Sequence, residues 1–107
     1  MIFITAKFAV KAESAETWPD IAAEFTEATR NEPGNMFFDW SRSLDDPSEY
    51  VLVEGFRDGD AGKKHVTSEH FKKFTAEAPK VLAATPLIIS HTIDADGWSE
   101  MGEMKVG

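Results

Sequence analysis

The chain has 107 residues, of which 42% are hydrophobic and 28% charged, with a formal net charge of −8. It contains no cysteine, which excludes disulfides, thiolate catalysis and cysteine-ligated metal sites. The acidic balance lacks the basic face that nucleic acid or an anionic membrane surface would need, and no apolar run approaches the ~20 residues that span a bilayer. We therefore expect a single globular domain. With no cysteine and no leader-like start at residues 1–7, we expect it to be cytoplasmic.

The first third of the chain predicts a strand followed by a helix. Residues 2–10 place large apolar side chains at every second position, which is typical of a strand. Residues 18–29 then place them at spacings of three and four, which indicates an amphipathic helix. Thr17 with Asp20 resembles a capping box at the start of this helix. Glu32-Pro33-Gly34 ends it, with the glycine free to adopt a positive φ.

The rest of the chain predicts a hairpin, a helical segment and a last strand. Strands at 35–43 and 50–56 flank a turn at 45–48. A short helix at 61–66 follows, and Ser68 is placed to cap a further helix that ends or kinks near Pro79. The last strand is predicted over 87–93.

The element order β-α-β-β-α-β predicts an α+β fold of the ferredoxin-like type, with a four-stranded antiparallel sheet and its helices on one face. The first, third and fourth strands carry large apolar residues on both faces, so the sheet needs two covers. We expect a second copy of the chain to supply one cover, giving a homodimer packed sheet to sheet. The domain is expected to span residues 1–93. The polar tail at 94–107 either crosses to the partner or is loose.

Several strings in the same order resemble the antibiotic biosynthesis monooxygenase (ABM) family: Glu32-Pro33-Gly34-Asn35, Asp45-Asp46-Pro47, Tyr50 to Phe56, and His65 to Phe74. The resemblance implies a dimeric α+β barrel. It also implies, among other activities, cofactor-independent oxidation of quinols and polycyclic phenols. Some relatives degrade haem, but the positions matching their functional residues are Lys7, His65 and Thr75, and none has the required residue type.

Oxygenation without flavin or metal requires a base, and the sequence offers three titratable candidates. His65 and His70 are the candidate bases because imidazole titrates near neutrality. They are five residues apart, about 140° around a continuous helix, so a break at Ser68 decides whether they face one way. Glu54, in the middle of an apolar strand, is the candidate that orients and polarises the His65 ring. For each residue, a structural role remains the alternative.

A flat aromatic substrate needs an apolar wall, for which we identify Trp40, Phe56 and Phe38, although for Phe38 a place in the core is preferred. Asn35 is a candidate oxyanion donor or, by preference, part of a left-handed turn after Gly34. Arg42 is a candidate ligand for a substrate oxygen or a partner of the acidic turn at 45–46. His91 is expected at the dimer face rather than in catalysis.

The leading hypothesis is a cofactor-independent monooxygenase for a quinol or phenolic substrate. No HxH or HExxH spacing indicates a metal site, and no glycine-rich loop indicates a nucleotide, so no cofactor is expected. Two alternatives stay open. One is a cofactor-free isomerase using the same acid–base pair. The other is a non-catalytic dimer that binds a small hydrophobic ligand.

Overall fold

The computed structural model describes all 107 residues and has the predicted element order. One four-stranded sheet carries all of the strands, and the helices follow the first and third strands in the chain. The strands are β1 (Ile2–Ala9), β2 (Asn35–Arg42), β3 (Glu49–Phe56) and β4 (Leu87–Thr92). The helices are α1 (Trp18–Arg30), α2 (Gly59–Val66) and α3 (Glu69–Glu77), with short 3-10 turns at Ala12–Ser14, Ala78–Val81 and Gly102–Met104. The ferredoxin-like α+β prediction is confirmed.

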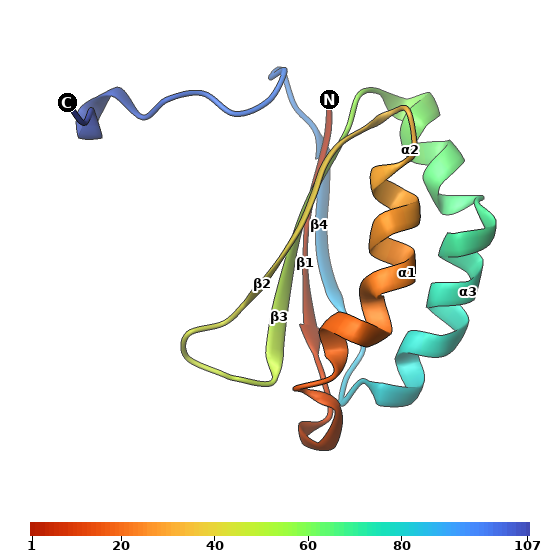
Figure 1. The fold of residues 1–107 in the computed structure, drawn as a ribbon. Coiled ribbons are helices and arrows are strands. Elements are labelled where there is room, and N and C mark those ends of the chain that lie inside the picture. Colours follow the sequence, from red (N-terminus) through yellow and green to blue (C-terminus); the bar gives the residue numbers. More distant parts are fainter.

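The sheet has the strand order β2-β3-β1-β4, and all of its neighbours are antiparallel. Ala6 in β1 lies opposite Leu52 in β3 and Ile88 in β4, so the two central strands present their even-numbered residues to one face. Figure 1 shows that α1, α2 and α3 all cover this face, while the C-terminal tail leaves on the opposite side. This register directs Glu54 and Phe56 toward the helices.

The helix starts agree with the sequence at α3 and differ from it at α1. Ser68 caps α3 by accepting the N–H of Phe71, as predicted. Thr17 makes no capping bond to α1, so the capping-box prediction is wrong; its hydroxyl donates instead to the Ser14 carbonyl at 3.2 Å. A preceding 3-10 turn supplies that carbonyl and thereby removes the hydroxyl from the helix end.

The end of α1 also differs from the expected left-handed turn. Gly34 does not have a positive φ, and neither does any non-glycine residue. Glycine is required at position 34 for a different reason: a Cβ there would lie 2.2 Å from the Cβ of Ala61. Asn35, rather than serving a turn, donates its amide to the carbonyls of Phe37 and Gly55 across an irregularity in the β2–β3 register. The close Gly34–Ala61 contact brings α2 against the start of β2.

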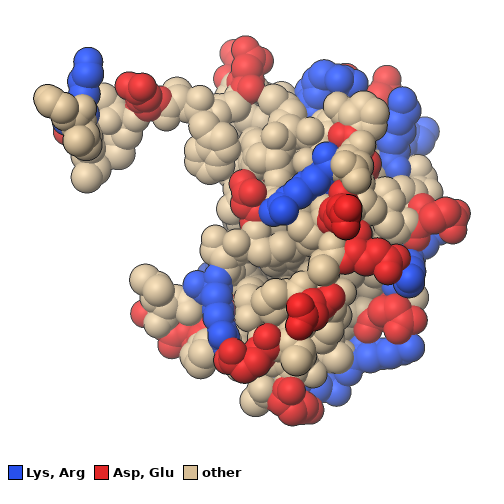
Figure 2. Space-filling model, viewed as in Figure 1, with Lys and Arg blue, Asp and Glu red and all other residues tan.

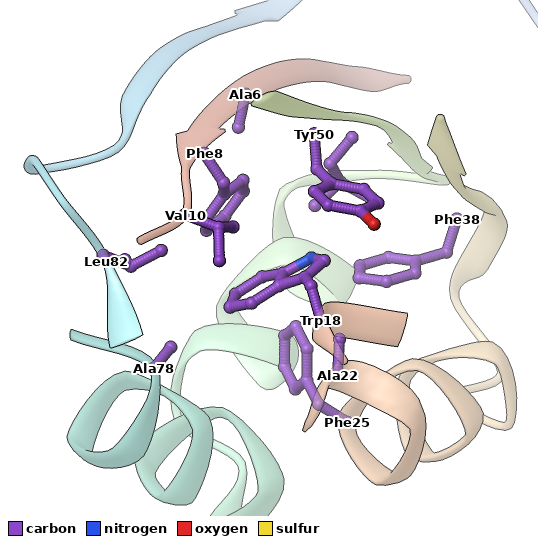
Figure 3. Packing of buried hydrophobic residues seen from close by; sticks show 11 residues of the cluster. Ala6, Phe8, Val10, Trp18, Ala22, Phe25, Phe38, Tyr50, Ala78 and Leu82 are labelled. Atoms are coloured by element: carbon purple, nitrogen blue, oxygen red, sulfur yellow. The ribbon is translucent and has the colours of Figure 1, made fainter. Parts of the chain in front are cut away.

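The core lies between the sheet and the helices and is dominated by aromatic rings (Figure 3). Trp18 is almost fully buried and lies 5.6 Å, centroid to centroid, from both Phe8 and Trp40. Phe25 of α1 stacks in parallel on Phe74 of α3 at 4.1 Å. Aromatic pairs of this kind add to the free energy gained from burial alone, and here they fix α1 and α3 against each other.

The opposite face of the sheet is not covered by any helix (Figure 1). All of β4 is exposed, including Leu87 and Ile89. In the tail, the ring of Trp98 lies 5.4 Å from that of Phe37 on this face. Figure 2 shows that charged side chains gather over the helices and the β2–β3 turn, and that the hollow between this turn and the tail is mostly uncharged. No helix is both long and apolar enough to cross a membrane.

Candidate active site

His65 occupies the last turn of α2 and points inward, with only 4% of its surface exposed. Its ring lies 4.7 Å from that of Phe56 on β3 and 5.1 Å from that of Phe71 on α3, centroid to centroid. Phe25 of α1 closes a third side at 5.7 Å. The imidazole is therefore held between two helices and the sheet in a nearly dry environment, and this burial lowers its pKa from the usual 6.5.

Glu32, which follows the end of α1, joins the two candidate histidines. Its Oε2 lies 2.8 Å from Nδ1 of His65 and 2.5 Å from Nε2 of His70. The convergence depends on the chain break between α2 and α3, where Ser68 starts a new helix axis. Because an ionised carboxylate only accepts hydrogen bonds, both ring nitrogens facing Glu32 carry hydrogen. The free lone pair of a neutral His65 is then on Nε2.

Glu54 lies on the other side of the His65 ring. Its Oε1 is 3.7 Å from Nε2 of His65, which is too long for a hydrogen bond, and this buried oxygen has no other partner. Burial, aided by the negative charge of Glu32, raises the pKa of Glu54 to about 7. Near neutral pH this carboxyl is therefore protonated in a large fraction of molecules and can donate a hydrogen bond.

These two groups face an apolar cavity of about 280 Å³ between α3 and strands β1 and β4. Nine of its fourteen lining residues are hydrophobic, and Glu54 and His65 are its only titratable ones. Thr75 and Ile88, both exposed, also line it and mark its opening to solvent. The remaining lining residues are Ala6, Phe8, Phe25, Leu52, Phe71, Phe74, Ala78, Pro79, Leu82 and Pro86. This combination of an apolar wall and convergent polar groups is typical of a small-molecule site.

The structure separates Trp40 from this cavity. Trp40 lies beyond Phe8, at 5.0 Å between centroids, and its Nε1 donates to Thr26 Oγ1 at 2.9 Å. It lines a different hollow, of about 380 Å³, together with Trp18 and Tyr50. The expected wall of Trp40 beside His65 is therefore not formed, because Trp40 lies opposite Leu52 on the edge strand β2, whereas the residue opposite Glu54 is Phe38. Phe38 is a core residue at 1% exposure.

The other candidate residues are engaged elsewhere. Arg42 forms a 2.6 Å ion pair with Glu16 and donates to the Pro47 carbonyl, so its carboxylate partner is not in the acidic turn. The Asn35 amide is used by the backbone of the hairpin, as described above. His91 lies opposite Phe3 in the register, on the face away from the helices. Of the predicted residues, His65, His70, Glu54 and Phe56 are brought together. Only His65 and Glu54 line the cavity, and Phe56, expected in its wall, is fully buried behind the His65 ring.

Glu32 is the member of the site that the sequence does not reveal. In the sequence, Glu32 stands out only as part of the Glu-Pro-Gly string that ends a helix. It is also more than 30 residues away from both histidines. The donor atoms of Glu32, His65 and His70 all lie within 4.8 Å of one another, which makes them the one group of histidines and carboxylates compact enough to hold a metal ion.

Comparison with known proteins shows the family of this chain. Residues 1–77 match the sequence model of the family described as antibiotic biosynthesis monooxygenase. The Bacillus subtilis (strain 168) protein "Putative monooxygenase YcnE" is 30% identical over 92 residues, which cover 86% of this chain and 96% of that protein. A solved Caulobacter crescentus protein of the antibiotic biosynthesis monooxygenase type is 25% identical, with a TM-score of 0.80 and 90% of each chain covered.

The fold is also shared with Rv0793 of Mycobacterium tuberculosis, at a TM-score of 0.81 and 21% identity, over 91% of this chain and 98% of that one. The matched family region contains β1 to α3 and therefore all of Glu32, Glu54, His65 and His70. The chain accordingly belongs to the antibiotic biosynthesis monooxygenase family.

Proposed function

We propose that this protein is a cofactor-independent monooxygenase whose substrate is a quinol or another small phenol. The observation that carries the proposal is the gap between Glu54 Oε1 and His65 Nε2, 3.7 Å wide and facing an apolar cavity. A phenolic oxygen near this gap would accept a hydrogen bond from the Glu54 carboxyl and give its proton to His65. The cavity, at about 280 Å³, suits one or two fused rings.

In this mechanism His65 is the general base and Glu32 the residue that positions it. His65 Nε2 takes the phenolic proton, and the imidazolium that forms is stabilised through its Nδ1–H bond to Glu32. The protonated Glu54 donates to the developing phenolate and stabilises its charge. The apolar lining keeps water away from the ring, so these two interactions act at low dielectric.

The electrons for oxygen reduction come from the substrate itself. The phenolate gives one electron to O₂, and the resulting superoxide combines with the phenoxyl radical at a ring carbon to form a C–O bond. Loss of the ring hydrogen from that carbon, as a proton, breaks the O–O bond, leaving a carbonyl on the ring and releasing water once His65 returns its proton. A quinol and O₂ thus yield a hydroxyquinone and water, a four-electron oxidation that needs no further reductant.

The isomerase alternative, for a phosphorylated substrate, has less support. Such a substrate would need cations beside the base, and no lysine or arginine lines the cavity. Arg42 is paired with Glu16, and Lys7 lies on the sheet face away from the helices. The cavity is therefore suited to an uncharged aromatic molecule.

The proposed activity is tested by oxygen consumption. Metal-free protein should consume one O₂ per hydroquinone, naphthohydroquinone or anthrol oxidised, and His65→Ala should lose most of the rate. The control is His91→Ala, which removes an imidazole that lies on the opposite face of the sheet. If no member of the panel supports oxygen uptake, or if His65→Ala retains the full rate, the proposal is wrong. Isomerisation or ligand binding under anaerobic conditions would point to the alternatives.

We further propose that the protein is a homodimer through the uncovered face of the sheet. Phe3, Phe37 and Val53 are only half-buried there, and Trp98 of the tail lies over Phe37. A partner sheet would bury these side chains, with the tail at 94–107 completing the contact. Light scattering should give twice the chain mass for the native protein and the mass of one chain for Val53→Lys. A native monomer would contradict the proposal.

A further inference from the structure

Three side chains from three separate parts of the chain meet at the outer end of the site. Glu32 follows α1, His65 lies in the last turn of α2 and His70 lies in the first turn of α3. One carboxylate oxygen and two ring nitrogens lie within 4.8 Å of one another. His65 is buried, whereas the side chains of His70 and Glu32 are 22% and 14% exposed, so solvent reaches one side of the group.

We propose that Glu32, His65 and His70 form a binding site for one divalent transition-metal ion of the zinc type. Two imidazoles and one carboxylate are donors that such ions bind in proteins. Softer metal ions and clusters that need thiolate ligands are excluded because the chain contains no cysteine. A hard ion such as Mg²⁺ would need more oxygen ligands than the single carboxylate supplies.

Side-chain movements of about 1 to 1.5 Å would let the three groups hold an ion. At metal–ligand distances of about 2.1 Å, donor atoms in a tetrahedral shell are roughly 3.4 Å apart. Glu32 Oε2 now lies 2.8 Å from His65 Nδ1 and 2.5 Å from His70 Nε2, so it has to withdraw by less than about 1 Å. The two imidazole nitrogens, now within 4.8 Å of each other, have to approach by up to about 1.4 Å, which rotation of the partly exposed His70 side chain can supply. A water molecule arriving from the exposed side of His70 completes the shell.

Glu54 supports this assignment from behind the ring. A histidine that binds a metal through one nitrogen usually donates its other N–H to a carboxylate. With the ion on Nδ1, His65 carries its proton on Nε2, 3.7 Å from the otherwise unpartnered Oε1 of Glu54. Glu54, His65 and the ion would thus form a carboxylate–imidazole–metal arrangement, in which the His65 Nε2–H faces the buried oxygen of Glu54.

The charges around the site do not oppose a cation. The hollow beside Glu32 contains Arg57 and Lys64, but also Asp58 and Asp60. These four charges cancel, leaving Glu32 as the net negative group beside the ion.

Occupation of the site would switch off the base. A metal on Nδ1 fixes the proton on Nε2, the atom that has to accept the phenolic proton in the mechanism above. Zinc-type ions would therefore inhibit the proposed oxygenase by holding His65 in its other tautomer. The binding itself does not depend on the proposed activity, so it can be measured with no substrate present.

The test is metal binding to the full chain after chelator treatment and removal of the chelator. Zn²⁺ titrated in competition with a chromophoric chelator should bind one ion per chain and should raise the thermal midpoint, because the ion links three elements of the native state only. Co²⁺ should give the visible absorption bands of a low-coordinate N/O site. Glu32→Gln and His70→Ala, at partly exposed positions, should each weaken Zn²⁺ binding by at least about tenfold and remove the thermal shift.

The matched control is His91→Ala, which removes a histidine outside the group and should leave the affinity unchanged. Circular dichroism confirms that each variant is folded. The proposal is overturned if the native chain binds no ion, or if the folded Glu32→Gln and His70→Ala variants bind as the native chain does. Equal losses in His91→Ala and His70→Ala would show only scattered surface binding and would overturn it as well.

Discussion

Nδ1 of His65 lies 2.8 Å from Oε2 of Glu32, although the two residues are 33 positions apart in the chain. This contact fixes the tautomer of a buried imidazole and leaves its Nε2 lone pair facing the cavity.

Replacing Glu32 by Gln should lower kcat for the phenolic substrate by about 10- to 100-fold, the equivalent of one hydrogen bond to a charged group. KM should change little because Glu32 does not line the cavity. Loss of the carboxylate also destabilises the imidazolium, so the acidic limb of the pH–rate profile should move to lower pH. Glu27→Gln, at an exposed position of α1, serves as the control. A uniform loss of rate with an unmoved limb would indicate a purely structural role.

The pH–rate profile of the native enzyme should be bell-shaped. Its acidic limb follows protonation of His65, whose pKa burial lowers below 6.5. Its alkaline limb, near pH 7, follows ionisation of Glu54, which then no longer donates to the substrate. Glu54→Gln keeps a donor at every pH, so it should lose the alkaline limb and keep the acidic one. An unchanged alkaline limb in this variant would contradict the assigned role of Glu54.

The same substitution has a consequence for stability that needs no substrate. Burial raises the pKa of Glu54 from 4.5 to about 7, so between these pH values the native state binds more protons than the unfolded state. Native stability due to this group therefore falls as the pH rises through that window. The unfolding free energy of Glu54→Gln minus that of the native chain should increase by about 3 kcal/mol from pH 4.5 to 7.5. Urea titrations across this pH range measure the difference in unfolding free energy. A difference that does not change with pH would exclude a raised pKa for Glu54.

The opening of the cavity can be narrowed at one position. Thr75 is exposed and lines the cavity, so Thr75→Phe should place a ring across the opening and raise KM several-fold with a smaller effect on kcat. Ala76→Phe is the matched control, since it adds the same bulk to the next, exposed residue of α3, which does not line the cavity. Steady-state kinetics on both variants measure this. Equal increases in KM would show that the substrate does not enter through this opening.

Gly34 should tolerate no side chain. A Cβ at this position would lie 2.2 Å from Ala61 Cβ and 3.3 Å from its Cα, so Gly34→Ala must displace α2 and the His65 it carries. We expect a loss of about 1–3 kcal/mol in unfolding free energy, as for other overpacked contacts. Gly59→Ala, where a Cβ would meet nothing within 4 Å, should stay within about 0.5 kcal/mol of the native chain. Equal effects in thermal melts of the two variants would contradict this account.

The fold could be predicted because its signals are local. Alternating side chains in β1, the Ser68 cap and Pro79 each act within a few residues, and each has its expected place in the structure. The positions of Glu32 and Trp40 could not be predicted in this way. Whether a carboxylate or an indole reaches the His65 ring is set by the β2–β3 register and by how the helices pack, which depends on contacts such as Gly34–Ala61 and Phe25–Phe74. No spacing in the sequence encodes these long-range contacts.

Because the chain breaks between α2 and α3, the site depends on the change of helix axis at Ser68 as much as on which residues are present. In an unbroken rod, positions 65 and 70 would point about 140° apart, and Glu32 would contact at most one of them. A variant that kept all three side chains but replaced Ser68 by a strong helix former, and so merged the two segments, would disperse the cluster. In this small domain, the break between two short helices is therefore what brings Glu32, His65 and His70 together.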